Sequence, residues 1–302
     1  MSLSPLTGLW PPAATPFNET GAVDTTRLVA HGRAMIADGA KGLAILGTTS
    51  EANSLGLDER RRVIDACVAS GIAASQLLPG TGSASLADAI ALTRHAAALG
   101  SAGVLLLPPF YYKGVTDAGV FAFIAKLIEG CGAQVPRVLL YHIPQQTAVG
   151  FSLELIAKLI AAFPGVVVGM KDSSGDFPRI KGIIEAFPGF AVFPGAETHA
   201  VAAMAAGAVG CISATANINA RAIATLVREW QAPDAGRRQD DVNAVRRAAE
   251  ARGLISSVKV VLAERYRDPA WRSVRPPLLP LDEAGRAALL ADPAIAGLFA
   301  AA

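Results

Sequence analysis

The stretch that decides the fold is Gly165-Val-Val-Val-Gly-Met-Lys-Asp-Ser-Ser-Gly-Asp176, an almost wholly apolar run that ends in a single lysine, Lys171. Apolar runs bounded by glycine and rich in valine are typical of strands buried on both faces of a parallel sheet. Burial at the end of such a strand disfavours the charged form of lysine, and a neutral amine attacks carbonyl carbon to form a Schiff base. The alternative is a lysine that leaves the strand and reaches into solvent.

Short apolar runs alternate with amphipathic stretches along most of the chain. The apolar runs, which predict strands, cover residues 8–15, 42–47, 77–80, 103–107, 137–141, 166–171, 190–193 and 209–212. The amphipathic stretches, which predict helices, cover residues 25–38, 58–70, 85–99, 116–129, 152–163, 177–187, 198–206 and 219–231. A helix after every strand predicts parallel strands joined by crossovers.

Eight such units favour an α/β fold of the closed (β/α)₈ TIM barrel type. An open, doubly wound sheet is the alternative. The dinucleotide-binding fingerprint that would favour this alternative is incomplete, because Gly80-Thr81-Gly82 lacks the third glycine.

The pattern changes at about Pro233. Arginine-rich helix signals at 239–252 and 254–266 are followed by the proline-rich segment 276–280 and a last helix from Asp282, with no strand between them. We therefore predict two parts: a barrel catalytic domain over residues 1–232, and a C-terminal helical extension over residues 233–302 that packs on the barrel and is not a second catalytic domain.

Composition narrows the class of protein. Of the 302 residues, 52% are hydrophobic and 17% charged, and the net charge of +2 is not gathered in a basic patch, which argues against nucleic acid as a partner. Cys67, Cys131 and Cys211 lack paired spacing, which disfavours a disulfide framework or a zinc site and suits a reducing cytoplasm. Residues 1–5 do not resemble a signal peptide, and no apolar run approaches the roughly 18 residues that cross a bilayer. We expect a soluble cytoplasmic protein with no membrane partner.

Catalytic residues of such barrels lie where strands end. The strand 42–47 leads into Gly47-Thr48-Thr49-Ser50-Glu51, where hydroxyl and successive N–H groups would form a carboxylate-sized anion site or, alternatively, an ordinary helix-capping turn. The next candidate, Tyr141, would either pass protons or be a core aromatic with a satisfied hydroxyl group. His142 should point to the opposite side of its strand, away from the lumen.

Other lysines compete poorly with Lys171 as the reactive amine. Lys41 lies at the start of its strand, at the opposite end of the barrel, and Lys113 lies in a loop where hydration keeps it charged. The remaining lysines fall on predicted helices: Lys126, Lys158, Lys181 and Lys259. A buried lysine, a tyrosine and a hydroxyl-lined anion site together indicate a class I aldolase that acts on a 2-oxo acid.

Several motifs, in order and with consistent spacing, resemble one family over nearly the whole chain. They are Ala14-Thr15-Pro16-Phe17, Gly47-Thr48-Thr49-Ser50-Glu51, Tyr141-His142-Ile143-Pro144, Gly169-Met-Lys171-Asp-Ser-Ser-Gly-Asp176, Gly195-Ala196-Glu197 and Gly210-Cys-Ile212-Ser-Ala-Thr-Ala-Asn217. The chain thus resembles the dihydrodipicolinate synthase and N-acetylneuraminate lyase superfamily of pyruvate-dependent class I aldolases.

The resemblance implies roles for the residues at the barrel mouth. Lys171 would form the imine with pyruvate or a related 2-oxo acid, and Thr48 and Thr49 would hold its carboxylate. Tyr141 would shuttle protons, with the Thr48 hydroxyl group as a relay. The backbone carbonyl of Ile212 would face the catalytic lysine.

The resemblance also implies an assembly and a cofactor requirement. Tyr111 matches a tyrosine that family tetramers lend to the relay of a neighbouring subunit, and Tyr112 takes this role if the register slips by one residue. The expected oligomer is a homotetramer built as a dimer of dimers, with neither a metal nor an organic cofactor.

The chain departs from the family pattern where the second substrate would bind. True dihydrodipicolinate synthases carry, five residues after the tyrosine, an arginine that grips the carboxylate of aspartate semialdehyde; here the residue is Gln146, preceded by Gln145. A neutral amide makes no charge-assisted bidentate pair with a carboxylate. Ser50 replaces the usual glycine, and His142 the usual asparagine.

We therefore predict an aldolase or lyase that condenses or cleaves pyruvate, or a related 2-oxo acid, with an aldehyde other than aspartate semialdehyde. A sugar-acid derivative and 4-hydroxy-2-oxoglutarate are candidate substrates. One alternative is a genuine 4-hydroxy-tetrahydrodipicolinate synthase of lysine biosynthesis. Another is a 2-oxo-acid binding or regulatory protein without turnover, which Lys171, Tyr141 and Thr48 disfavour because a complete set of reactive groups is retained.

Overall fold

This computed structural model describes residues 5–300. Its named strands pair in parallel, and in the larger sheet each strand lies beside the next strand along the chain. One sheet consists of β2 (Val104–Leu106), β3 (Val138–His142), β4 (Val167–Asp172) and β5 (Ala191–Pro194). A second pairs β1 (Gly8–Leu9) with β6 (Gly210–Cys211). The segment 1–4, most of the stretch searched for a signal peptide, lies outside the described residues.

Backbone hydrogen bonds close these strands into a ring. The N–H groups of Lys41 and Ala44 donate to the carbonyls of Leu9 and Pro11 at 2.9 and 2.8 Å. Isolated parallel bridges continue the ring from Leu43 to Leu77 and from Gly80 to Leu105. The ring is completed between β5 and β6 by hydrogen bonds from Val209 to Val192 and from Ile212 to Pro194. The predicted (β/α)₈ barrel is confirmed.

The first three predicted strands are much shorter than expected, whereas the ends of the others differ from the prediction by one residue. The first ends at Leu9 because Pro11 and Pro12 have no N–H group to donate to a neighbour. The second and third are extended segments joined by single bridges. The second ends at Leu46, whose positive φ of 60° turns the chain out of the extended conformation.

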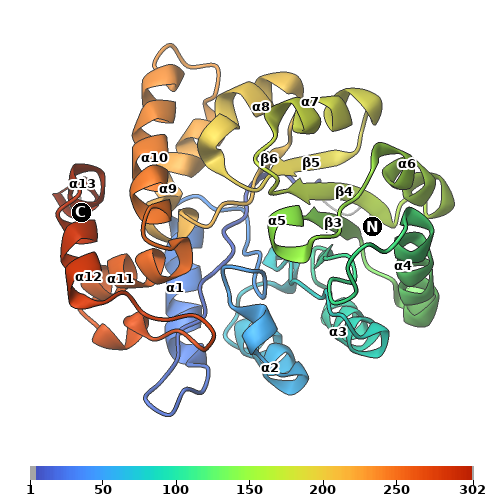
Figure 1. Cartoon of the computed structure of the whole chain (residues 1–302), viewed down its shortest axis with the longest axis horizontal. Coiled ribbons are helices and arrows are strands. Elements are labelled where there is room, and N and C mark those ends of the chain that lie inside the picture. Colours follow the sequence, from blue (N-terminus) through green and yellow to red (C-terminus); the bar gives the residue numbers. More distant parts are fainter. Residues whose placement is uncertain (1–4, 301–302) are drawn as a thin grey trace.

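The helices surround the ring of strands (Figure 1). They are α1 (Thr25–Ala37), α2 (Leu57–Ala69), α3 (Leu86–Ala98), α4 (Asp117–Cys131), α6 (Leu153–Ala162), α7 (Phe177–Ala186), α8 (Ala200–Ala206) and α9 (Ala216–Arg228). The short helix α5 (Pro144–Thr147) lies in the loop that follows β3. Five of the helices begin after a side chain that caps a backbone N–H: Asp24, Ser85, Thr116, Ser152 and Asp176. Helix α5 was not predicted, and α9 begins three residues early because it includes a kink at Asn219.

Short 3₁₀ turns complete the barrel and its loops. They are η1 (Ala52–Ser54), η2 (Ala74–Gln76), η3 (Gly132–Gln134), η4 (Glu197–His199) and η5 (Pro269–Arg272). None of the helices within residues 5–300 is both long and apolar enough to cross a membrane.

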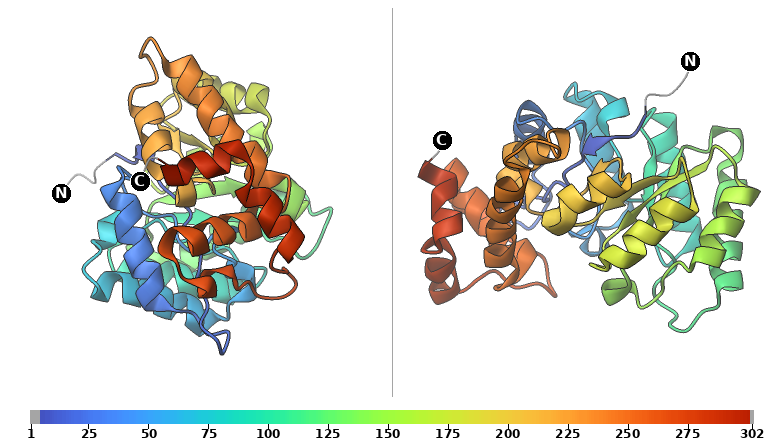
Figure 2. Two further views of the ribbon diagram at one scale, coloured as in Figure 1. Left: turned by 90° about the vertical axis from the view of Figure 1, so that its left-hand side faces the viewer. Right: turned by 90° about the horizontal axis from the view of Figure 1, so that it is seen from above.

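The C-terminal segment is helical and lies against one side of the barrel (Figure 2). It contains α10 (Ala235–Glu250), α11 (Leu254–Tyr266), α12 (Glu283–Leu290) and α13 (Pro293–Ala300). The single last helix that we predicted from Asp282 is two helices, since Pro293 starts a new helix. Buried side chains of α11 share one apolar cluster with Ala14 and Ile218 of the barrel, so this segment is joined to the barrel by a common core.

Candidate active site

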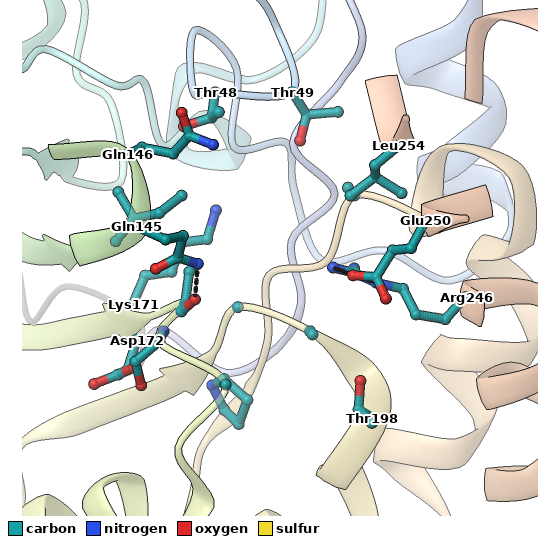
Figure 3. Close-up of a pocket in the computed structure, with 18 of the residues that line it drawn as sticks. Thr48, Thr49, Gln145, Gln146, Lys171, Asp172, Thr198, Arg246, Glu250 and Leu254 are labelled. Carbon is teal, nitrogen blue, oxygen red and sulfur yellow. Dashed lines mark hydrogen bonds and ion pairs between the residues drawn. The ribbon is translucent and has the colours of Figure 1, made fainter. Parts of the chain in front are cut away.

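A cavity of about 600 Å³ opens at the carboxyl ends of the strands. Its floor and walls come from three sources: the turn after the second barrel strand, the loops after β3, β4 and β5, and helices α10 and α11 (Figure 3). The lining residues used below are Thr48, Thr49, Tyr141, Gln145, Gln146, Lys171, Thr198, Arg246, Glu250 and Ser256. The cavity is therefore shared between the barrel and the C-terminal helices.

Lys171 lies near the end of β4 and lines this cavity, although its side chain is only 3% exposed. In the sheet it is in register with Tyr141 on β3 and Phe193 on β5. Its Nζ lies 4.2 Å from the centre of the Tyr141 ring. The strand therefore delivers one amine to the cavity in a mostly apolar setting.

Asp172 fixes the chain just after the lysine. This buried carboxylate accepts a hydrogen bond from the Ser174 N–H at 2.9 Å and pairs with Arg179 Nε at 3.0 Å. Arg179 also donates to the carbonyl of Phe151. Because both carboxylate oxygens are engaged with neighbouring elements, the end of β4 has little freedom to move Lys171.

Tyr141 and Thr48 form a hydrogen-bonded pair beside the lysine. Their hydroxyl oxygens are 3.1 Å apart. Burial would raise the pKa of Tyr141, but the positive charge of Lys171 opposes this effect. Hydrogen bonds with Thr48, Lys171 and Ser173 act in the same direction as that charge, and the net result is a lowered pKa. A tyrosine with a lowered pKa gives up and regains a proton more readily than an ordinary one.

The turn from Gly47 to Glu51 presents its backbone to the cavity. Its internal hydrogen bonds run from Ser50 to Gly47 and from Glu51 to Thr48, at 3.1 and 3.0 Å. Among residues 5–300, no group accepts a hydrogen bond from the backbone N–H of Thr48 or Thr49. Those two N–H groups and the Thr48 and Thr49 hydroxyl groups are donors that an anion could use. The assignment of this turn as an anion site stays a prediction.

The wall opposite Lys171 carries side chains from the C-terminal helices (Figure 3). Arg246 on α10 pairs with Glu250 at 2.6 Å and lies 3.6 Å from the buried Glu197. The positive charge of Arg246 is thus balanced by two carboxylates, those of Glu250 and Glu197. Thr198 and Ser256 add hydroxyl groups to the cavity lining.

Gln146 lines the cavity, as the comparison of motifs predicted, and is exposed there. Its neighbour Gln145 donates to the carbonyl of Ser173 at 2.6 Å, which ties the loop after β3 to the loop after β4. Both amides can donate and accept hydrogen bonds but carry no charge.

Four other residues singled out in the sequence lie outside the cavity lining. Tyr111 and Tyr112 are 72% and 73% exposed, and their rings contact each other edge to face. Ile212 is fully buried. His142 points away from the lumen, as predicted: its Nδ1 accepts the backbone N–H of Phe151, and burial lowers its pKa.

Sequence reasoning missed the part played by Glu197. This wholly buried carboxylate accepts hydrogen bonds from the hydroxyl groups of Ser213 and Thr215. Preceding it, Gly195 lies so close to Ser173 that an added Cβ would approach the Ser173 Oγ within 1.9 Å. The Gly195-Ala196-Glu197 motif therefore packs the loop after β5 against the loop that follows Lys171.

The arrangement of metal-ligating side chains bears on whether the protein could bind a metal ion. Within residues 5–300, no group of three or more histidine, cysteine, aspartate or glutamate side chains is arranged to hold a metal ion. The expectation of an enzyme without a metal or an organic cofactor stays a prediction.

Comparisons with known proteins agree with the geometry. The model of the "Dihydrodipicolinate synthetase family" matches residues 5–293. An "Uncharacterized DapA-like lyase" of Chloroflexus aurantiacus is 35% identical over 92% of each chain. The crystal structure of dihydrodipicolinate synthase from Agrobacterium tumefaciens covers 97% of this chain and 100% of its own, with a TM-score of 0.89 and 30% identity. A Clostridium difficile protein, CdNal, solved in complex with mannosamine, shares the fold at 22% identity, with a TM-score of 0.86 and coverage of 95% of this chain and 97% of its own.

Proposed function

This chain belongs to the dihydrodipicolinate synthetase family and is a lyase of the aldolase type, and we propose that Lys171 performs its chemistry by forming a Schiff base with pyruvate or a related 2-oxo acid. One observation carries the proposal: Lys171 lines the cavity, and its Nζ lies 4.2 Å from the ring centre of Tyr141, whose hydroxyl group is hydrogen-bonded to Thr48. The Lys171 amine, the Tyr141 hydroxyl group and the Thr48 and Thr49 donors all line the same cavity.

In the first step, the neutral Lys171 amine attacks the carbonyl carbon of the oxo acid. The carbonyl oxygen takes up protons and leaves as water, so that a C=N bond replaces the C=O bond. Loss of a proton from the adjacent methyl carbon then converts the imine into an enamine. We propose that Tyr141 accepts and returns these protons and that the Thr48 hydroxyl group, 3.1 Å from the Tyr141 hydroxyl group, relays them.

The carboxylate of the oxo acid would bind at the turn that carries Thr48 and Thr49. The free N–H groups of this turn lie at the same end of the barrel as Lys171 and are suited to a single carboxylate. Binding there fixes the carbonyl carbon relative to the amine, which is the proximity effect that such catalysis needs.

The enamine carbon would then attack an aldehyde to form a C–C bond, or the reverse reaction would cleave one. We propose that this aldehyde is not aspartate semialdehyde. Gln146 is uncharged, and the cation on the opposite wall, Arg246, is already paired with Glu250. Hydroxyl and amide groups fit a hydroxylated aldehyde better than a second free carboxylate. This favours a sugar-acid derivative over 4-hydroxy-2-oxoglutarate as the substrate that is formed or cleaved, because 4-hydroxy-2-oxoglutarate carries a carboxylate at both ends.

The exposed Tyr111 supports a homotetramer, a dimer of dimers, in which Tyr111 enters the relay of a neighbouring subunit. A tyrosine pair that is more than 70% exposed is unusual for aromatic side chains and fits a subunit contact. Tyr112 takes the same role if the register differs by one residue.

We also propose that the protein is cytoplasmic. Residues 233–302 would be an extension of the barrel domain 1–232. The backbone carbonyl of Ile212 would contact the imine.

A panel of aldehydes tests the proposal. Purified protein is incubated with pyruvate and each aldehyde, and pyruvate consumption is followed. We expect turnover with hydroxylated aldehydes and much slower turnover with aspartate semialdehyde. Rapid turnover with aspartate semialdehyde would instead support a genuine 4-hydroxy-tetrahydrodipicolinate synthase, the activity that the Agrobacterium relative's description suggests. Formation of the adduct without any turnover would support the binding-protein alternative.

A further inference from the structure

The turn that offers Thr48 and Thr49 to the substrate is held in an unfavourable backbone conformation. Leu46 and Glu51, at its two ends, have positive φ angles of 60° and 56°. Residues other than glycine avoid this region because the Cβ atom approaches the carbonyl oxygen. Such conformations persist only where surrounding contacts impose them.

The contacts that hold Glu51 come from the C-terminal extension: one from helix α11 and one from the segment between η5 and α12. Its side chain is completely buried, and both carboxylate oxygens have partners. Oε1 pairs with Lys259 of α11, which is itself fully buried. Oε2 accepts the backbone N–H of Arg275 at 2.8 Å.

Lys259 is in turn fixed by its surroundings. Its Nζ donates to the carbonyl of Ser273 at 2.6 Å and lies 4.3 Å from the ring centre of Phe17. Burial lowers its pKa to about 8, which leaves the amine mainly charged at pH 7. These contacts hold the Lys259 ammonium group of α11 against the Glu51 carboxylate at the end of the turn.

We propose that Lys259 is a positioning residue, which acts through its buried ion pair with Glu51 to hold the Gly47–Glu51 turn in the conformation that binds the substrate carboxylate. The inference rests on the proposed function, since it assigns this turn to the 2-oxo acid. It gives the C-terminal extension a part in catalysis, although Lys259 does not line the cavity.

The test compares Lys259→Met with Arg265→Met. Both residues are cations on α11; Lys259 is buried and Arg265 is half-buried, and Arg265 donates to the carbonyl of Ile218, away from the turn. For each variant, the Lys171 adduct with pyruvate is trapped with borohydride at a series of pyruvate concentrations, and the thermal midpoint is recorded. We expect the half-saturating pyruvate concentration to rise about tenfold or more in Lys259→Met, and to stay within about twofold in Arg265→Met even where the loss of thermal stability is similar.

The double variant Glu51→Met, Lys259→Met separates folding from positioning. Replacing a buried ion pair by two apolar side chains often preserves stability, so this protein should fold even if Lys259→Met does not. We expect it to require the same raised pyruvate concentration, while Lys259→Arg restores part of the affinity. Unchanged half-saturation in the folded double variant overturns the inference alone. Failure of the unaltered protein to form any adduct overturns the proposed chemistry and this inference together.

Discussion

Replacing Tyr141 with phenylalanine removes one oxygen from the site and little else. The ring is 2% exposed and packs beside the Lys171 amine, and phenylalanine keeps this packing. The lost hydroxyl group is the partner of Thr48 at 3.1 Å and also hydrogen-bonds with Lys171 and Ser173, so these bonds disappear together. Stability should fall by about 1 to 3 kcal/mol, or roughly 2 to 6 °C in thermal midpoint for a chain of this size.

The effect on proton transfer should be larger than the effect on stability. A positioned proton carrier contributes about 10²- to 10⁴-fold to such steps. Because Tyr141 has a lowered pKa and is hydrogen-bonded to Thr48, we expect its removal to slow proton transfer by at least about 100-fold.

Exchange of the methyl protons of pyruvate for deuterium measures this step directly. The exchange requires imine and enamine formation but no aldehyde, so it can be followed by NMR before the second substrate is known. We expect Tyr141→Phe to keep the trapped adduct on Lys171 and to lose most of the exchange. Exchange within about threefold of the unaltered protein would refute the role of Tyr141.

Three further predictions follow from the same contacts. Thr48→Val should reduce the methyl exchange by about 10-fold or more and raise the pKa of Tyr141. Thr48→Ser keeps a hydroxyl group and should retain most of the exchange. An equal loss of exchange in both variants would argue against a proton relay through Thr48. Gln146→Arg should raise kcat/KM for aspartate semialdehyde by about tenfold over that for an uncharged aldehyde, and no change in this ratio would remove Gln146 as the specificity residue. Burial lowers the pKa of His31 from 6.5 to about 4. The contribution of neutral His31 to the free energy of unfolding should therefore be fully present above pH 6.5 and should fall by about 3 kcal/mol as the pH drops to 4. Urea unfolding at pH 5 and pH 7 should show this loss of stability, and His31→Gln, which cannot titrate, should show a smaller loss.

The strand that carries Lys171 was predictable because its apolar valines and terminal lysine form a local pattern. Its neighbours on the barrel were predictable for the same reason, since the fold places all strand ends at one mouth. The sequence therefore led to Tyr141, Thr48 and Thr49, and the structure brings their side chains to the cavity around Lys171.

The C-terminal contribution was not predictable in the same way. Arg246 and Glu250 reach the cavity only because α10 packs against the barrel, and no local pattern in a helix says which loop it will face. Lys259 did leave a signal. It is flanked by Val258, Val260 and Val261, an apolar setting that indicated burial, but its partner Glu51 is 208 residues away in the sequence.

The central claim is that Lys171 forms an imine with a 2-oxo acid. The most direct test is to incubate the protein with pyruvate and borohydride, measure the intact mass and map the modified peptide. We predict one reduced pyruvyl adduct, on Lys171. No adduct, or an adduct on Lys113 in the loop that follows β2, would contradict the assignment of the catalytic amine and leave the barrel fold in place.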